Sequence, residues 1–231
     1  VIAGESGSGK SVTAMSVMRL IKEPGKIIKG EILYKGMDLL KLSRKDMESV
    51  RGNHISMIFQ NPYTSLHPYF KIGRQTTEFL SHRLMMGKNE AEEKTLEMFK
   101  QLGIDDPISV LNSYSFEISA GICQRVMLAI ALLSKPKLLI ADEPTTNLDS
   151  LTQIQILELI KLMREELKMS VLFITHDFGV VSKMADNVVV MYAGNQVETG
   201  PKEEVLHNPK HPYSIGLIGS VPTTGKVAKR L

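Results

Sequence analysis

Residues 4–11 of the chain read Gly-Glu-Ser-Gly-Ser-Gly-Lys-Ser, which fits the pattern G-x-x-x-x-G-K-[ST] of phosphate-binding loops. The apolar run Val1-Ile2-Ala3 comes directly before these residues, and Val12 to Met18 follow them with the composition of a helix. Glycines between a buried strand and a helix let backbone N–H groups close around a phosphate, and the helix N-terminus adds the positive end of its dipole. The flanking residues therefore favour a P-loop over a glycine-rich turn that contains a lysine by chance.

The P-loop pattern assigns a role to each of its positions. Lys10 is expected to reach the β- and γ-phosphates, and the Ser11 hydroxyl is expected to ligate Mg²⁺. The predicted nucleotide-binding residues are Gly4, Glu5, Ser6, Gly7, Ser8, Gly9, Lys10, Ser11 and Val12.

Composition limits the class of protein. The net charge of the 231-residue chain is only +3, without the basic tract that typifies nucleic-acid binding, so we expect no nucleic-acid partner. The single cysteine, Cys123, excludes an internal disulfide and suits a reducing cytoplasm. Apolar runs such as residues 126–133 are far shorter than the roughly 20 residues that span a bilayer. No signal peptide is visible, and since Val1 already lies in an expected strand, we expect further chain upstream.

Strand and helix patterns alternate, which predicts an α/β fold with a mostly parallel sheet covered on both faces. Apolar runs at residues 138–141, 171–174 and 188–191 indicate buried strands, and the last is followed by a turn at 193–195. A helix is expected after Asp149, which is a plausible N-cap. Its apolar positions recur at helical spacing: Leu151, Ile154, Leu157, Ile160, Met163 and Leu167.

The stretch from residue 61 to residue 133 differs, because it shows helical patterns and no convincing strand. We expect a helical subdomain here, inserted into an α/β core formed by residues 1–60 and 134–205. Asn89 and Glu92 resemble a capping box at the start of one helix. Its buried face would hold Ala91, Thr95, Met98 and Leu102. Residues 206–231 are expected to form a C-terminal extension that is irregular from Pro209 onward.

Two adjacent carboxylates, Asp142 and Glu143, follow the apolar strand at residues 138–141. Open α/β sheets bind ligands at the carboxyl ends of their strands. Since successive strand residues point to opposite sides, the two carboxylates are expected to have different roles. Asp142 suits the Mg²⁺ shell, and Glu143 suits a base or orienter for the water that attacks a γ-phosphate. The alternative, two solvated acids at a strand end, is disfavoured by the P-loop upstream.

With these motifs, nearly the whole chain resembles the ATP-binding cassette (ABC) ATPases. Four further segments carry the resemblance: Phe59-Gln60-Asn61-Pro62 as a Q-loop, Ser119-Ala120-Gly121-Ile122 with Gln124-Arg125 as the signature motif, Asn147-Leu148-Asp149 as the D-loop, and Thr175-His176-Asp177 as the switch histidine. The resemblance implies a P-loop NTPase (RecA-like) core with an inserted helical subdomain.

The resemblance also implies a head-to-tail dimer that binds two ATP molecules with Mg²⁺ at its interface. Glu143, His176 and Gln60 would then be catalytic, and Ser11, Gln60 and Asp142 would serve the metal. His176 would hydrogen-bond the γ-phosphate. The signature residues Ser119, Ala120, Gly121 and Ile122 would contact the nucleotide bound by the partner, and Asp149 would lie near the dimer seam.

Two departures from the family pattern stand out. The signature L-S-G-G-Q reads Ile118-Ser119-Ala120-Gly121-Ile122 here, so a methyl group is added and a polar side chain is lost near the phosphate. We therefore expect the ATP site that uses this signature to be weakened. The strands and the adenine-stacking aromatic that the family carries upstream of the P-loop are expected to be missing from this sequence.

Several segments resemble the oligopeptide, dipeptide and nickel importers within the family: residues 60–68, 124–131 and 143–146, and in the tail 208–214 and 220–222. This resemblance implies a peripheral subunit on the cytoplasmic face of the membrane. Its partners would be a second ABC ATPase subunit, identical or different, and two membrane permease subunits. The permeases' coupling helices would contact residues 60–70, and a solute-binding protein would take part indirectly. No iron–sulfur cluster is expected within these residues.

Two alternatives stay open at this point. One is a non-transport ABC ATPase that acts in DNA repair or translation, although no sustained heptad lies between residues 60 and 119 and the chain has one P-loop. The other is a nucleotide-binding regulator without turnover, which Glu143 and His176 argue against. The transported solute is set by other proteins, so peptides, nickel and other small solutes all remain candidates.

Overall fold

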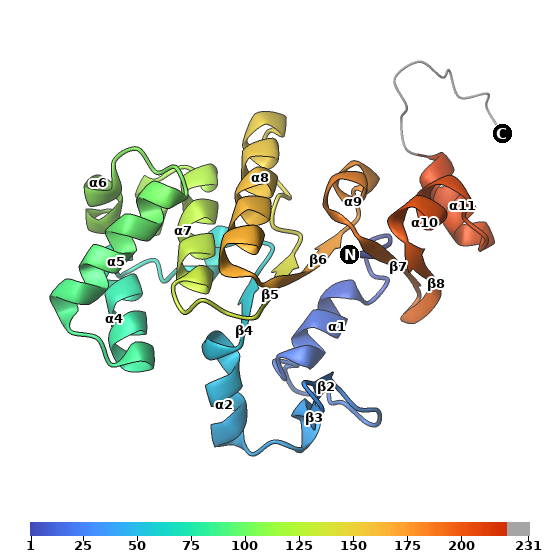
Figure 1. Ribbon diagram of the computed structural model, residues 1–231, viewed down its shortest axis with the longest axis horizontal. Coiled ribbons are helices and arrows are strands. Elements are labelled where there is room, and N and C mark those ends of the chain that lie inside the picture. Colours follow the sequence, from blue (N-terminus) through green and yellow to red (C-terminus); the bar gives the residue numbers. More distant parts are fainter. Residues whose placement is uncertain (221–231) are drawn as a thin grey trace. The chain divides into compact units, whose positions relative to one another are not determined.

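The computed structural model describes residues 1–220, in which strands and helices alternate before and after an all-helical stretch at residues 61–133 (Figure 1). The chain forms two compact units: one contains residues 1–13 and those from 173 onward, and the other contains residues 14–172. The boundary falls inside helix α1 (Lys10–Val17) and inside strand β6 (Ser170–Thr175).

The first unit contains a parallel set of strands that holds the chain's start. Strand β1 (Ile2–Ala3) lies between β6 and β7 (Asn187–Tyr192) and pairs in parallel with both. Ala3 is the register partner of Thr175 and of Val190. Strand β8 (Asn195–Pro201) pairs with β7 in antiparallel fashion. Helices α9 (Phe178–Met184), α10 (Lys202–His207) and α11 (Pro212–Gly219) complete the described part of this unit.

The predicted strands and the turn after β7 are confirmed, but the sequence reading of the C-terminal region was incomplete. Strand β8 was not predicted, because Asn195–Pro201 is largely polar and lacks clear alternation. The expectation of an irregular tail from Pro209 is wrong for α11. The proline at the first helical position and the His211 side chain, which accepts the Tyr213 N–H, both favour that helix start. The tail beyond residue 220 lies outside the described residues.

The second unit pairs strand β4 (Ile55–Ile58) with β5 (Leu138–Asp142) in parallel, with Ile58 opposite Ala141. Their carboxyl ends therefore meet at one edge. A small antiparallel hairpin joins β2 (Leu33–Tyr34) to β3 (Met37–Asp38), followed by a 3₁₀ turn (Leu39–Lys41) and helix α2 (Arg44–Asn53). Helix α8 (Ser150–Leu167) follows β5, and Asp149 caps it as predicted.

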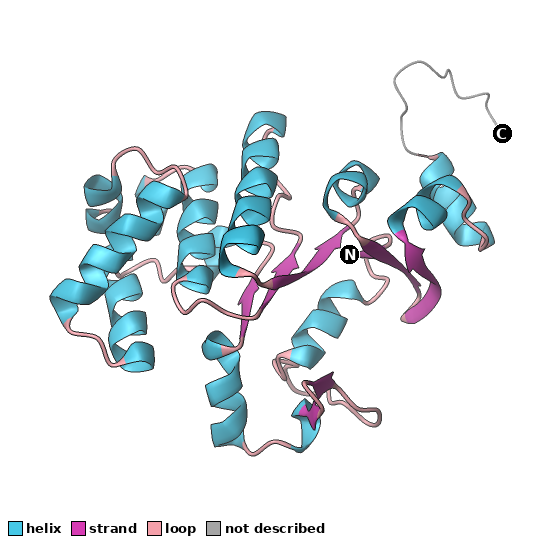
Figure 2. Ribbon diagram, in the orientation of Figure 1, coloured by secondary structure: helices cyan, strands magenta, loops and turns pink. Residues whose placement is uncertain are grey.

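Residues 61–133 contain only helical elements (Figure 2), which matches the sequence-based expectation. These elements are α3 (Pro62–Ser65), α4 (Ile72–Leu84), α5 (Lys88–Gln101), α6 (Pro107–Asn112), a 3₁₀ turn (Ser115–Glu117) and α7 (Ala120–Leu132).

The predicted inner face of α5 is confirmed, since Ala91, Thr95, Met98 and Leu102 are all buried. The capping box at Asn89 is wrong. The helix begins at Lys88, with Gly87 as its N-cap, because the Ala91 N–H donates to the Gly87 carbonyl. Asn89 therefore lies inside the helix and does not cap it. None of the helices in residues 1–220 combines the length and the apolar content that crossing a membrane requires.

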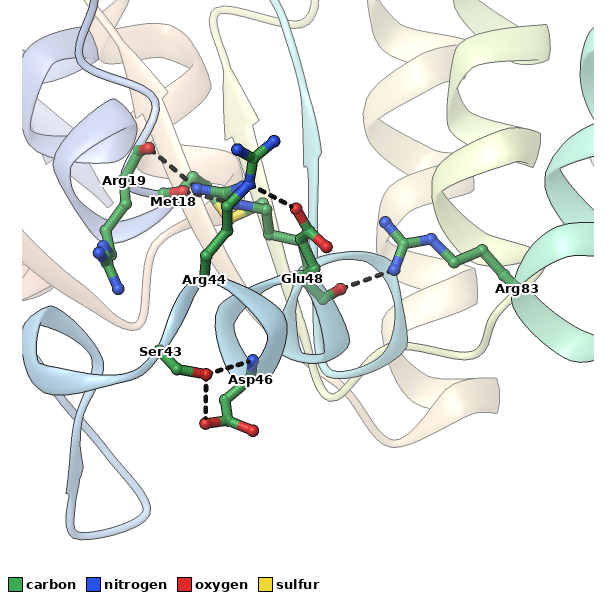
Figure 3. A network of polar contacts seen from close by, with 8 residues as sticks. Met18, Arg19, Ser43, Arg44, Asp46, Glu48 and Arg83 are labelled. Atoms are coloured by element: carbon green, nitrogen blue, oxygen red, sulfur yellow. Dashed lines mark hydrogen bonds and ion pairs between the residues drawn. The ribbon is translucent and has the colours of Figure 1, made fainter.

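The C-terminal end of α1 is stabilised by an arginine from α2. The Arg51 guanidinium donates to the Met18 carbonyl over 2.8 Å and to the Arg19 carbonyl over 2.9 Å, in the turn that directly follows α1. Figure 3 shows this region, where Arg83 also donates to the Glu48 carbonyl of α2. Arg51 thereby joins two helices that lie far apart in the sequence.

We predict that Arg51→Ala lowers the free energy of unfolding by about 2 kcal/mol, because two charge-assisted hydrogen bonds to backbone carbonyls are lost. Arg44→Ala is the matched control on the same helix. It removes an exposed ion pair with Glu48 and is expected to cost less than about 0.5 kcal/mol. Urea denaturation followed by circular dichroism measures both. Equal losses in the two variants would contradict the role given to Arg51.

Candidate functional site

The loop between β1 and α1 adopts a conformation that depends on glycine. Gly4, Gly7 and Gly9 have φ angles of +152°, +81° and +101°, which residues with a Cβ rarely adopt. A Cβ on Gly4 would lie 2.3 Å from the Met191 carbonyl oxygen and 2.9 Å from the Ser8 hydroxyl oxygen. Both the lack of room for a Cβ and the positive φ angle therefore require glycine at position 4.

Lys10 and Ser8 line the inside of this loop. Lys10 is 4% exposed, and its ammonium donates to the carbonyls of Gly4 and Glu5 over 2.8 Å each. The Ser8 hydroxyl is buried and has no hydrogen-bond partner within residues 1–220. A cradle of backbone that a Cβ would fill, with an orphaned hydroxyl and the N-terminus of α1, fits a bound polyphosphate.

His176 stands at the strand edge from which the loop starts. Ala3 and Thr175 are register partners in adjacent parallel strands, so Gly4 and His176 both follow the carboxyl ends of those strands. His176 is exposed. The next residue, Asp177, caps α9 by accepting the Gly179 N–H over 2.7 Å. The first unit therefore brings together the predicted P-loop and the predicted switch histidine.

The two carboxylates belong to the second unit, and both are buried: Asp142 is 4% exposed and Glu143 is 8% exposed. Strand β5 ends at Asp142, and Glu143 has a φ of +46°. The strand alternation that was expected to separate their roles therefore does not extend to Glu143, where the backbone turns.

The Glu143 carboxylate is held by two donors. Gln60 Nε2 and Thr146 Oγ1 each donate to its Oε2 over 3.0 Å. Gln60 reaches it because β4 and β5 are in register, with Ile58 opposite Ala141 two residues earlier. The pairing of Gln60 with Glu143 was not predicted, and neither was Thr146. The sequence signal that could have identified Thr146 is its position three residues after Glu143, in the turn that follows β5.

The predicted signature motif forms the start of α7. Ser119 is the N-cap, and its hydroxyl accepts the Ile122 N–H over 3.3 Å. A Cβ on Gly121 would lie 2.9 Å from Thr152 Cγ2 in α8. Thr152 also donates its hydroxyl to the Asp149 carboxylate over 2.6 Å. Thr152, which sequence reasoning missed, therefore links the predicted signature to the predicted D-loop.

Hydrogen bonds fix the charge of Asp149. The Thr152 hydroxyl and N–H, together with the Leu151 N–H, lower the pKa of its carboxyl below the ordinary value, although desolvation opposes them. The carboxylate form is therefore the one that caps α8 at neutral pH.

Among residues 1–220, no group of three or more His, Cys, Asp or Glu side chains could hold a metal ion. Mg²⁺ is commonly bound through one or two carboxylates or hydroxyls together with substrate phosphates and water. Asp142 has a carboxylate and Ser11 a hydroxyl, as this mode uses, and Gln60 has an amide oxygen.

Two family models match the chain. Residues 1–146 match the model described as ABC transporter, and residues 197–231 match the C-terminal region of oligopeptide/dipeptide transporters.

Curated relatives match along nearly the whole chain. The oligopeptide transport ATP-binding protein OppD of Bacillus subtilis is 51% identical over 223 residues, which is 96% of this chain and 62% of OppD. The dipeptide transport ATP-binding protein DppD of Lactococcus lactis is 47% identical over 231 residues, covering 100% of this chain and 66% of DppD. The chain thus spans about two thirds, or slightly less, of the length of these relatives.

Solved structures share the fold. The ATP-binding cassette MJ0796, a dimer in a post-hydrolysis state with ADP and Pi, superposes with a TM-score of 0.75 and 27% identity over 87% of this chain and 84% of that chain. The cbiO1 protein of Clostridium perfringens, part of the ABC transporter complex cbiONQ, superposes with a TM-score of 0.74 and 28% identity. The match covers 90% of this chain and 78% of that chain.

We predict that Gly4→Ala lowers the free energy of unfolding by about 3 kcal/mol or more, because its Cβ meets backbone and its φ is strained. Gly7→Ala is the matched control: it carries a positive φ, yet no atom lies within 4 Å of its added Cβ. Its cost is expected to be about 1–2 kcal/mol. Urea denaturation measures the free energy of unfolding of both variants. Similar losses in the two would show that the contact with Met191 does not constrain the loop.

Proposed function

Because this chain belongs to the ABC transporter family, with the α/β fold of a P-loop NTPase, we propose that it is the ATP-hydrolysing subunit of an importer. It would couple binding and hydrolysis of Mg-ATP to the uptake of peptides, or of another small solute such as nickel, through membrane permeases. The C-terminal model and the printed names of OppD and DppD support peptides as the first solute to test.

The observation that carries the enzymatic part is the position of Glu143. A buried carboxylate fixed by two donors on one oxygen is suited to orient a water molecule and to accept its proton as the water attacks the γ-phosphate. Gln60 and Thr146 act by holding this carboxylate in one rotamer. A nucleotide-binding regulator without turnover would have no use for such an arrangement.

The P-loop residues would bind the nucleotide. Backbone N–H groups of residues 6–12 would surround the phosphates, and the Lys10 ammonium would exchange the carbonyls of Gly4 and Glu5 for the β- and γ-phosphates. His176 would donate a hydrogen bond to the γ-phosphate. Mg²⁺, when bound, would be held by Ser11, Asp142 and Gln60 and would neutralise charge on the phosphates.

A dimer would complete the ATP site. The start of α7, with Ser119, Ala120, Gly121 and Ile122, would contact the nucleotide held by a partner subunit, and Asp149 would lie near the seam. The dimeric, nucleotide-bound MJ0796 cassette supports this arrangement. Ala120 and Ile122 depart from the family signature, so the site that uses this signature would be the weaker of the two.

The second unit also offers a surface for a permease. An apolar groove of about 290 Å³ lies beside α3, α4 and α7, and its lining includes Phe59, Leu66, Phe79, Met127 and Ile130. The groove adjoins the predicted contact region at residues 60–70. We propose that helices of two permease subunits dock there, which would place the chain on the cytoplasmic face of the membrane. The assembly of cbiO1 into cbiONQ supports such a complex.

We predict that Lys10→Ala lowers ATP turnover by about 100-fold or more, because a preorganised cation is removed from the developing phosphate charge. Lys22→Ala, an exposed lysine outside the loop, is the matched control and should retain the parent's turnover. Phosphate release by the purified transporter complex measures both. A Lys10→Ala variant as active as the parent would assign the activity to a contaminating ATPase.

We predict that Glu143→Gln abolishes most hydrolysis while ATP still binds, since the amide cannot accept a proton. Thr146→Val, which removes a hydroxyl that donates to the carboxylate, should lower turnover by about 3- to 10-fold. Single-turnover hydrolysis and ATP binding are measured for each variant and for the corresponding change in the partner subunit. If only the partner's change abolishes turnover, Glu143 is not the catalytic carboxylate.

A further inference from the structure

The C-terminal region contacts the P-loop directly. The hydroxyl oxygen of Tyr213, in α11, accepts a hydrogen bond from the Glu5 backbone N–H over 3.1 Å. These two residues are 208 positions apart in the sequence. Tyr213 belongs to residues 197–231, which match the oligopeptide/dipeptide C-terminal model, whereas Glu5 belongs to the cassette match at residues 1–146. The C-terminal region therefore supplies a group to a loop of the cassette.

The contact falls on the peptide group that joins Gly4 to Glu5. The carbonyl of this peptide accepts from the Lys10 ammonium over 2.8 Å, and its N–H donates to Tyr213. The next carbonyl, that of Glu5, accepts from Lys10 over 2.8 Å and from the Ser8 N–H over 3.2 Å. Rotation of the Gly4–Glu5 peptide plane would break bonds on both of its sides. Tyr213 thus fixes the orientation of the peptide on which Lys10 rests.

Tyr213 is itself held in place. The Glu198 carboxylate of β8 accepts the Lys210 N–H over 2.8 Å and the His211 N–H over 3.2 Å. The Tyr213 ring packs against Tyr192, with 4.5 Å between ring centroids. Tyr192 ends β7 directly before the turn in which the Gly194 N–H donates to the Ser8 carbonyl over 2.9 Å.

The charge of Glu198 strengthens this anchor. Burial acts to raise the pKa of Glu198, but the N–H groups of Lys210 and His211 that donate to its carboxylate act against it, and the pKa lies below the ordinary value. The carboxylate is therefore ionised at neutral pH, and its bonds to the start of α11 are charge-assisted.

We propose that Tyr213 is a positioning residue: through its hydroxyl, the C-terminal region preorders the P-loop for a nucleoside triphosphate. The inference rests on the proposed function in that the ligand is ATP. A loop held in one conformation loses less entropy when it closes on phosphates, so the hydroxyl strengthens nucleotide binding. Because the hydroxyl acts on the loop backbone at Glu5, we expect the chemical step to be unchanged.

The test is Tyr213→Phe in the full chain, which keeps the ring and its packing on Tyr192 but removes the acceptor. Amide hydrogen exchange at Glu5, followed by NMR, should become faster. The dissociation constant for ATP and the KM should both rise about 3- to 10-fold, which is the value of one hydrogen bond, while kcat stays at the parent's value. Tyr192→Phe is the matched control, because it removes the hydroxyl from the other ring of the pair. It should change none of these quantities.

Several outcomes would overturn the proposal. Unchanged Glu5 exchange, faster exchange with unchanged ATP affinity, tighter ATP binding, or a fall in kcat at constant KM would each remove the role given to Tyr213. An equal effect of Tyr192→Phe would show that the change does not depend on the hydrogen bond between Tyr213 and Glu5. If the parent chain binds ATP without hydrolysing it, the proposed function fails, and Glu5 exchange with the dissociation constant still decides the role of Tyr213.

Discussion

The absence of a side chain at Gly4 is the constraint on which the nucleotide loop depends. Any Cβ there would lie 2.3 Å from the Met191 carbonyl of β7, so only glycine lets the chain leave β1 and turn against the neighbouring strand. This close approach places the loop next to the end of β7, where Gly194 donates to Ser8. The loop is therefore supported by the residues that follow β7, up to α11, as much as by the helix that it begins.

A second constraint, strand register, organises the carboxylate residues. The parallel pairing of β4 with β5 sets Ile58 opposite Ala141. Two residues further along, Gln60 and Glu143 face each other at the strand ends and form a hydrogen bond. The position of this glutamine is thus a consequence of sheet geometry, and its hydrogen bond helps to fix the orientation of the buried carboxylate. In the proposed enzyme, the Gln60 amide N–H would hold the catalytic base Glu143, and its amide oxygen would be available to Mg²⁺.

The sequence predicted the features that short segments determine. The strand–loop–helix at the start of the chain, the apolar strand runs and the Asp149 cap each depend on neighbours within a few positions, and each is confirmed. The capping box at Asn89 failed because helix starts that lack a side-chain cap, such as Gly87, leave no local signal. Strand β8 was missed because an edge strand can be polar. The contact between Glu5 and Tyr213 joins residues 208 positions apart, and no local pattern can predict such a pair.

The signature helix shows how internal packing limits what a motif reveals about its ligand. Gly121 is retained in this chain, but Thr152 Cγ2 leaves no room for a Cβ, and Thr152 is fixed in turn by its bond to Asp149. Contact between α7 and α8 is therefore enough to require that glycine, whatever the helix binds. The Ile122 N–H already donates to Ser119, so a phosphate that binds there must compete with the helix cap. In the proposed dimer, we therefore expect Ser119 and the methyl group of Ala120 to set the strength of this half-site.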